Sequence, residues 1–123
     1  MKAKSMDLVW IVVKDFKKAI KFYTEIAGLK LLKVSEEHGW AELEGHEGGA
    51  MIGIAAEKPQ NPYKAGQNGC LTFSVDDIEK AQEDLQKKGV QLLGGIQEIP
   101  GHVKLLLARD ADGNHFQLAQ MLE

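Results

Sequence analysis

Few residues of this chain have side chains that could bind or transform a small molecule. Its two tryptophans, Trp10 and Trp40, could stack on a flat ligand or could fill apolar space. His115 could act as a general base near neutral pH, although a polar side chain in a cavity wall is the simpler interpretation. The only cysteine, Cys70, is more consistent with a small buried residue than with a nucleophile, because nothing in the sequence would lower its thiol pKa. The chemistry therefore depends on which of these side chains the fold brings together.

An internal repeat predicts how these residues are positioned. The segment 13–19, Val-Lys-Asp-Phe-Lys-Lys-Ala, returns at 75–81 as Val-Asp-Asp-Ile-Glu-Lys-Ala, and the segment 28–32 returns at 89–93. A period of this size is one supersecondary module that is used twice. Two such copies are expected to meet around a shared cleft.

Each copy has the pattern of a strand, a helix and three further strands. The apolar run 8–13 suits a strand that is covered on both faces, Asp15 can cap the next helix, and Gly28 can end it. The other expected elements are strands at 29–34, 40–44 and 50–55, a strand at 70–75, a helix from Asp76 or Asp77 to Gly89, and strands at 91–93, 103–108 and 115–119. The polar segment 109–114 is expected to form the turn between the last two strands.

These elements predict an α+β fold. Two βαβββ modules in tandem would form a curved mixed sheet around a cleft, with the helices on the outer face. Module 1 is expected at about residues 6–57 and module 2 at about 69–121, with a linker rich in breakers and polar residues at about 58–68. With 123 residues in all, the two modules are expected to share one core in a single domain, 1–123.

Side-chain alternation along the strands predicts the lining of the cleft. In the first strand, Val9, Ile11 and Val13 form the aliphatic set expected beneath a helix, which leaves Trp10 on the opposite face. The same reasoning, transferred through the repeat, predicts a ligand-binding set of Trp10, Trp40, Glu42, Met51, Thr72, Ser74, Lys104, His115 and Gln117. Aromatic walls with a few polar groups are typical of small-molecule pockets.

Glu42 differs from the rest of this set because it would place a carboxylate in the cleft. A carboxylate that faces a cavity should be paired, because an isolated buried charge costs several kcal/mol. Lys104 is the expected partner, and this structural pair is at least as reasonable as a ligand role. Glu42 and His115 are also the candidates for catalysis.

Three segments, together with the duplicated pattern, resemble a known superfamily. They are Val13-Lys14-Asp15 followed by Ala19, Phe22-Tyr23 and Gly28-Leu29, then Val75-Asp76-Asp77, and finally Arg-Asp-Ala-Asp-Gly-Asn-His-Phe-Gln-Leu at 109–118. This combination is similar to the vicinal oxygen chelate superfamily, which includes glyoxalase I, extradiol dioxygenases, and fosfomycin- and bleomycin-resistance proteins. The resemblance covers essentially the whole chain. Ala111 stands where the family often has proline.

The resemblance implies four potential metal positions, one at the start and one on the last strand of each module. In the metalloenzymes these positions hold His, Glu and sometimes Gln, which supply nitrogen and oxygen ligands. Here they hold Leu8, Gly53, Cys70 and Gln117. Leu8 and Gly53 have no donor atom in their side chains, so we expect no divalent metal and no other cofactor.

The leading hypothesis is a metal-independent binding protein, similar to the bleomycin-resistance branch, that holds a small aromatic or amphipathic molecule in the cleft. The alternative is a glyoxalase-like lyase or isomerase with non-standard or absent metal ligands, in which His115 or Glu42 would transfer a proton. A structural or assembly role would be favoured if Trp10 and Trp40 themselves filled the cleft.

Composition limits the partners. The net charge of −3 argues against nucleic acid, because binding to phosphates needs clustered cations. A single cysteine allows no intrachain disulfide and suggests a reducing, cytoplasmic environment. Neither a signal peptide nor a membrane span is expected. By analogy with the superfamily we expect a homodimer, with modules that pair either within a chain or between chains.

Overall fold

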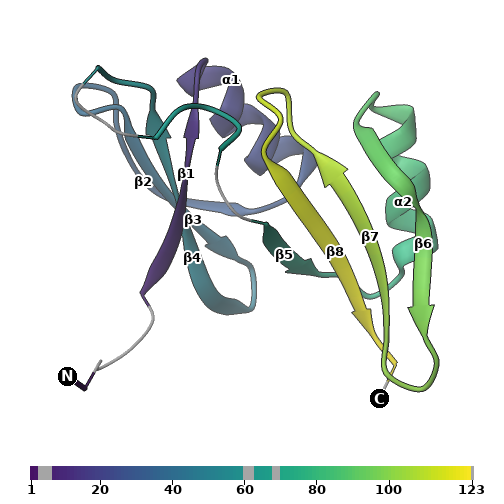
Figure 1. Ribbon diagram of the computed structural model, residues 1–123. Helices are drawn as coiled ribbons and strands as arrows, with labels where there is room; N and C mark the ends of the chain where they lie inside the picture. Colours follow the sequence, from purple (N-terminus) through teal and green to yellow (C-terminus); the bar gives the residue numbers. More distant parts are fainter. Residues whose placement is uncertain (3–6, 60–62, 68–69, 123) are drawn as a thin grey trace. The chain divides into compact units, whose positions relative to one another are not determined.

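The computed structural model describes residues 1–2, 7–59, 63–67 and 70–122 (Figure 1). The chain divides into two compact units, Met1–Asn68 and Gly69–Glu123. Unit 1 contains strand β1 (Leu8–Val13), helix α1 (Phe16–Lys21), the π-helical turn η1 (Phe22–Ile26), and strands β2 (Lys30–Ser35), β3 (Trp40–Gly45) and β4 (Gly48–Ala56). Unit 2 contains strand β5 (Leu71–Ser74), helix α2 (Ile78–Lys87), and strands β6 (Gln91–Ile99), β7 (Val103–Arg109) and β8 (His115–Met121).

Each unit is built on a four-stranded mixed sheet. The strand order is β1-β4-β3-β2 in unit 1 and β5-β8-β7-β6 in unit 2. In both sheets the first strand of the unit pairs in parallel with the last, and the other pairings are antiparallel. The α+β class and the tandem βαβββ modules are therefore confirmed, with two separate sheets in place of one. The shared cleft, the single domain and the linker at 58–68 stay predictions.

Aspartate caps start both helices as predicted. Asp15 accepts a hydrogen bond from the Lys18 backbone N–H at 3.1 Å, and Asp77 accepts one from the Lys80 N–H at 3.1 Å. Such caps satisfy backbone donors that would otherwise lack a partner in the first turn. At the other ends, Gly28 and Gly89 have positive φ values of 77° and 74°. Both glycines take the left-handed conformation expected after a helix.

The first helix ends in a π-helical turn that the sequence did not predict. The Ala27 N–H donates to the Phe22 carbonyl, five residues back, at 3.0 Å. The Thr24 hydroxyl donates to the Ile20 carbonyl at 2.8 Å, and such side-chain bonds compete with the regular backbone ladder. The wider turn leaves the Tyr23 ring fully buried. Packing of this ring thus coincides with a local departure from α-helical spacing.

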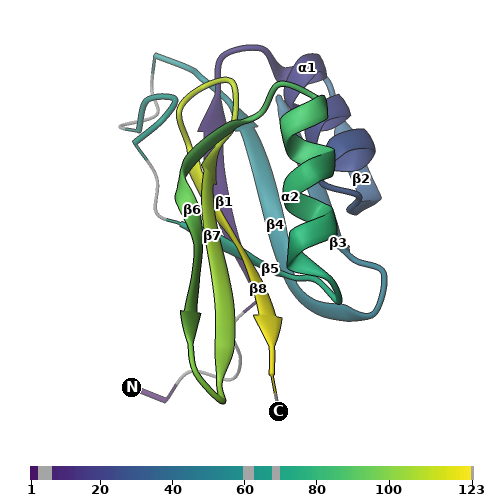
Figure 2. The same cartoon turned by 90° about the vertical axis from the view of Figure 1, so that its right-hand side faces the viewer.

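The core of each unit lies between its helix and one face of its sheet. In Figure 2, α2 lies along the sheet of unit 2. Leu106, Ala108 and Phe116 are almost completely buried on the strands, and Ile78 and Leu85 are buried on the helix. In unit 1 the corresponding buried residues are Ile11, Val13, Ala41, Leu43, Ile52, Ile54 and Tyr23. Alternation therefore predicts the helix-facing side of most strands correctly.

A buried polar cluster closes the turn between β7 and β8. Asp110 Oδ1 accepts hydrogen bonds from the backbone N–H groups of Asp112 at 2.9 Å and Asn114 at 2.8 Å. Asp110 Oδ2 accepts a third bond from Asn114 Nδ2 at 3.0 Å. Asn114 is fully buried and Asp110 nearly so. This carboxylate holds the turn that begins β8.

No helix within the described residues is long and apolar enough to cross a membrane.

Candidate binding site in unit 1

Strand register brings the two tryptophans and Glu42 onto one face of the unit 1 sheet. Gly53 on the central strand β4 lies opposite Trp10 on β1 and opposite Glu42 on β3. Trp40 lies opposite Ala55, two positions along the same face. Met51 shares this face at the start of the row, opposite Leu8. These four residues therefore share one face of the sheet, while their place in a cleft and their role in binding stay predictions.

The indole of Trp40 lies directly over Gly53. A Cβ atom built on Gly53 would be 2.3 Å from Cη2 and 2.7 Å from Cζ2 of Trp40, and 3.1 Å from Cβ of Trp10. No side chain larger than hydrogen fits there unless the indole moves. The glycine is therefore the feature that admits a large aromatic ring to the middle of the sheet.

The Trp40 ring is held by a polar contact and belongs to an aromatic cluster. Its Nε1 donates to Glu42 Oε2 at 2.8 Å, so the Glu42 carboxylate has an indole partner. The Trp10 and Trp40 ring centroids are 6.4 Å apart with an interplanar angle of 61°. The ring of Trp10 also meets Tyr63 edge to face, with centroids 5.4 Å apart. These separations lie within the range of attractive aromatic pairs.

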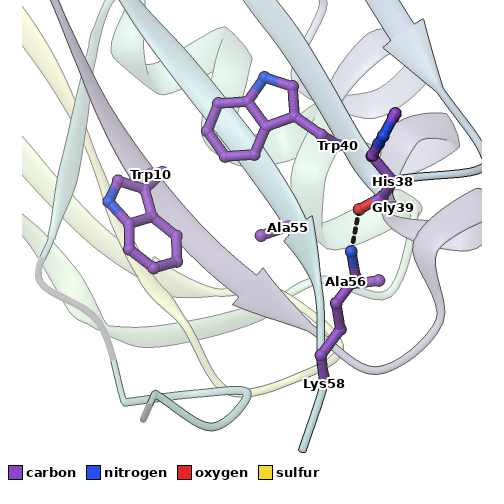
Figure 3. A pocket seen from close by; sticks show the side chains of 7 residues that line it. All are labelled: Trp10, His38, Gly39, Trp40, Ala55, Ala56 and Lys58. Atoms are coloured by element: carbon purple, nitrogen blue, oxygen red, sulfur yellow. Dashed lines mark hydrogen bonds between the residues drawn. The ribbon is translucent and has the colours of Figure 1, made fainter. Parts of the chain in front are cut away.

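A pocket opens beside the two indoles. Its volume is about 240 Å³, and its lining residues are Trp10, His38, Gly39, Trp40, Ala55, Ala56 and Lys58. Figure 3 shows the two indole rings on either side of Ala55. All seven residues belong to unit 1. The pocket is therefore described by this unit alone.

The loop before β3 and the end of β4 close one end of this pocket. The Ala56 N–H donates to the Gly39 carbonyl at 2.8 Å (Figure 3), and the Lys58 ammonium donates to the His38 carbonyl. Gly39 has φ +60°, and a Cβ there would lie 2.7 Å from the Ala56 Cβ. His38 Nδ1 lies 2.9 Å from the Ser35 hydroxyl. Backbone approach at Gly39 thus brings Lys58 to the pocket.

Sequence reasoning missed most of this end of the pocket. It assigned Lys58 and Tyr63 to a linker and gave no weight to His38 as more than a loop residue. The Gly-Trp pair at 39–40 was the available signal, because a glycine before a strand often marks a close backbone approach. Nothing in the spacing of Lys58 indicated that its side chain returns to the loop at His38.

The predicted residues of unit 2 form a separate, more polar face. Thr72 lies opposite Gln117, and the Gln117 amide donates to the Thr72 hydroxyl at 3.3 Å. His115 Nε2 accepts a hydrogen bond from Arg109 Nε at 3.1 Å, so this lone pair is already engaged. Ser74 is exposed and shares the face of Thr72. Whether this face joins the unit 1 pocket in one cleft stays a prediction.

The prediction that Lys104 shares this face is wrong. Leu105 and Leu107, not Lys104, lie opposite Ala119 and Gln117. Lys104 has the same side-chain parity as the buried Leu106, and its ammonium donates to Glu79 on α2 at 3.0 Å. The expected Glu42–Lys104 pair is therefore replaced by two other contacts, one in each unit. Trp40 pairs with Ala55 in the β3–β4 hairpin, and Leu105 pairs with Ala119 in the β7–β8 hairpin, so the second hairpin is one residue shorter between these pairs. Because side chains alternate along a strand, this difference of one residue turns the side chains of β7 to the opposite face from the one that the repeat predicted.

The Lys104–Glu79 contact predicts a pH-dependent contribution to stability. The hydrogen bond to Glu79 raises the pKa of Lys104, and the charges of Glu79, Glu98 and Asp77 add to the effect. A cation with a raised pKa stabilises the fold below its ordinary value of about 10.4 and loses this contribution as the pH rises through the raised value. We expect Lys104→Met to be less stable than wild type at pH 8, and the gap to close at a strongly alkaline pH above the raised pKa of Lys104. Urea unfolding at both pH values tests this, and a gap that persists at high pH would contradict it.

The residues at the four family metal positions do not fit a metal ion. Leu8 and Gly53 offer no donor, and the Trp40 ring occupies the space that a ligand side chain at Gly53 would need. Gln117 is bonded to Thr72. Cys70, predicted to be buried, is instead exposed, yet partial burial of its thiol raises its pKa and disfavours the thiolate that metals bind. In the part of the chain that the structure describes, no three His, Cys, Asp or Glu side chains gather closely enough to hold a metal.

Comparisons with known proteins support the predicted fold family. Residues 5–118 match the model of the Glyoxalase/Bleomycin resistance protein/Dioxygenase superfamily. The chain is 32% identical over 90 residues, 66% of its length, to the uncharacterized protein YraH of Bacillus subtilis (strain 168), of which it covers 70%. It is 28% identical over 120 residues, 88% of its length, to a probable lactoylglutathione lyase of Vibrio parahaemolyticus, of which it covers 84%.

A solved structure adds a relative of another kind. The chain matches the antibiotic binding protein TnmS3 from Streptomyces sp. CB03234 with a TM-score of 0.80 and 27% identity, over 98% of both chains. The chain spans only 41% of the length of a lactoylglutathione lyase of Arabidopsis thaliana, to which it is 28% identical. Relatives of this fold thus include binding proteins and enzymes.

Proposed function

Since this chain belongs to the Glyoxalase/Bleomycin resistance protein/Dioxygenase superfamily, we propose that it binds a small aromatic or amphipathic molecule against its two tryptophans, without a metal ion. The observation that carries the proposal is the position of Trp40. Its indole lies over Gly53, where a metalloenzyme of the family would hold a ligand side chain. At this position the chain therefore has the aromatic surface of Trp40 in place of a metal-coordinating side chain.

The pocket geometry supports binding over a purely structural role for the tryptophans. The two indoles pair with each other, but they do not fill the space beside them. Instead they lie on either side of Ala55 and border a pocket of about 240 Å³ (Figure 3). The similarity to an antibiotic binding protein over 98% of both chains supports the same class of function.

The first experiment is native mass spectrometry of protein freshly isolated without chelator, combined with metal analysis. We expect far less than one metal ion per chain and a retained organic ligand when the protein comes from its own cells. One tightly held Zn, Ni, Mn or Fe ion per chain would contradict the metal-independent proposal. The same spectrum reports the proposed homodimer.

Binding itself is measurable through intrinsic fluorescence, because both tryptophans of the chain line the pocket. We expect 2-naphthamide to quench the emission of Trp10→Phe and of Trp40→Phe, each of which keeps one indole as a reporter. Trp40→Ala should weaken binding about tenfold, because it removes one wall of the stack. Phe73→Leu, which alters an aromatic residue of unit 2, is the control and should leave the dissociation constant unchanged. Equal affinity of Trp40→Ala and wild type would exclude this site.

The second candidate is a lyase of the lactoylglutathione type, which the similarity to the Vibrio protein favours. In that case Glu42 or His115 would transfer the proton. Each already has a hydrogen-bond partner, Trp40 Nε1 for Glu42 and Arg109 Nε for His115. Assays of S-lactoylglutathione turnover with and without added divalent metal separate the two functions. Turnover that Glu42→Gln or His115→Ala abolishes would favour the enzyme, and no turnover under either condition would favour the binding protein.

A further inference from the structure

We infer that the ligand of the unit 1 pocket is a planar aromatic anion of one or two rings, whose negative group meets the Lys58 ammonium. This inference rests on the proposed function and adds the charge and size of the molecule that the site selects. It follows from three properties of the pocket: the charge of its lining residues, the hydrogen-bond donors that Lys58 still has available, and its volume.

The pocket carries one formal positive charge and no negative one. Of its seven lining residues, only Lys58 is charged at neutral pH when His38 is neutral, and none is Asp or Glu. This local sign opposes the net charge of −3 of the whole chain. Glu42, on the same sheet face as the two tryptophans, is not part of the lining, and it accepts a hydrogen bond from Trp40 Nε1 at 2.8 Å. The electrostatics of the pocket therefore favour an anion over a cation.

Lys58 is positioned to bind such an anion. Its ammonium donates to the His38 carbonyl, which anchors the head of an otherwise flexible side chain. An ammonium has three N–H donors, so two remain. Among the residues that the structure describes, no carboxylate forms an ion pair with Lys58, although other lysines of the chain have such partners. A half-buried cation without an acidic partner gains from a negative group on the ligand.

Much of the wall surface is apolar. Trp40 Nε1 is already occupied by Glu42, so this wall presents its carbon surface, and Ala55 and Ala56 contribute methyl groups. The volume of about 240 Å³ is below the roughly 300–1,000 Å³ of common ligand pockets. It is larger than the roughly 150 Å³ cavity that holds benzene in an engineered protein. A fused two-ring system with one anionic group matches these limits.

The test compares two ligands of nearly equal shape, 2-naphthoate and its neutral amide, 2-naphthamide, by tryptophan quenching. We expect wild type to bind the anion about three- to tenfold more tightly, since the ion pair is partly exposed to solvent. Lys58→Met should remove this preference, so that its affinities for the two ligands become equal within about twofold. Lys58→Arg should keep the preference, which separates the charge from the shape of the side chain. Added salt should reduce the preference in wild type only.

Lys87→Met is the matched control, because it removes the same charge from an exposed position on α2 in unit 2. It should retain the preference of the wild type. Equal affinity of wild type for the two ligands, or a preference that survives Lys58→Met, would overturn the inference and leave the proposed binding function intact if Trp40→Ala still weakens both ligands. If neither ligand quenches the protein, both the inference and the proposed binding function fail.

Discussion

Replacing Gly53 with alanine is expected to destabilise the protein by about 1–3 kcal/mol, the usual cost of an added methyl group in a filled space. The new Cβ would lie 2.3 Å from the Trp40 ring, so the indole must leave its place over β4. Gly53 is on the central strand pair of unit 1, between Trp10 and Glu42, which limits relaxation of the backbone. Elsewhere in a strand, exchanging glycine for alanine stabilises by restricting the unfolded chain. Urea unfolding measures the change in the free energy of unfolding.

A double-mutant cycle with Trp40→Ala isolates the cause. In the Trp40→Ala background the methyl group at position 53 has no ring to displace, so Gly53→Ala should be neutral or slightly stabilising, with a coupling free energy of about 1–3 kcal/mol. Gly95→Ala is the control, because a Cβ at Gly95 meets nothing within 4 Å. The same Gly53→Ala variant should also bind 2-naphthamide more weakly. A destabilisation that persists unchanged without Trp40 would show that the indole is not the obstacle.

Asp110→Ala is expected to cost about 3 kcal/mol or more, because it leaves buried donors without an acceptor. Two of the hydrogen bonds that Asp110 accepts come from Asn114, which is fully buried. The expected result is a lower urea midpoint with an unchanged slope, since the turn is a local feature of a folded unit.

Asp110→Asn is the informative control for that prediction. It keeps an oxygen for the two backbone N–H groups and loses the bond with the Asn114 amide, so its cost should be clearly smaller, at about 1 kcal/mol. A cost below about 1 kcal/mol for Asp110→Ala would mean that water replaces the carboxylate. The cluster would then not be the structural element that starts β8.

Much of the fold was predictable because its signals are local. The repeat of Val13 and Asp15 at Val75 and Asp77 identified two βαβββ modules, and both aspartates cap their helices. The polar segment at 109–114 was recognised as a turn from its Asp and Gly residues, and Gly113 does have a positive φ of 88°. In each case the residues that form the structure are neighbours in sequence.

The site was only partly predictable, because its geometry depends on register and on contacts between distant segments. Parity placed Trp10, Trp40 and Glu42 correctly, since a strand alternates whatever its neighbours are. It failed at Lys104, because the repeat alone does not reveal that one hairpin is a residue shorter than the other, and such a change turns every side chain of the strand to the other face.

By itself, the sequence determined the α+β class, the two modules, their caps and turns, and the absence of donor side chains at Leu8 and Gly53. Only the tertiary structure decided that Trp40 occupies the space over Gly53, that Glu42 bonds this indole, and that Lys58 reaches a pocket beside them. The physical reason is that caps, turns and alternation are short-range properties of the backbone. A pocket is instead the space that remains after side chains from separate strands have packed together. One added methyl group at Gly53 would displace the Trp40 ring and so change the shape of this pocket.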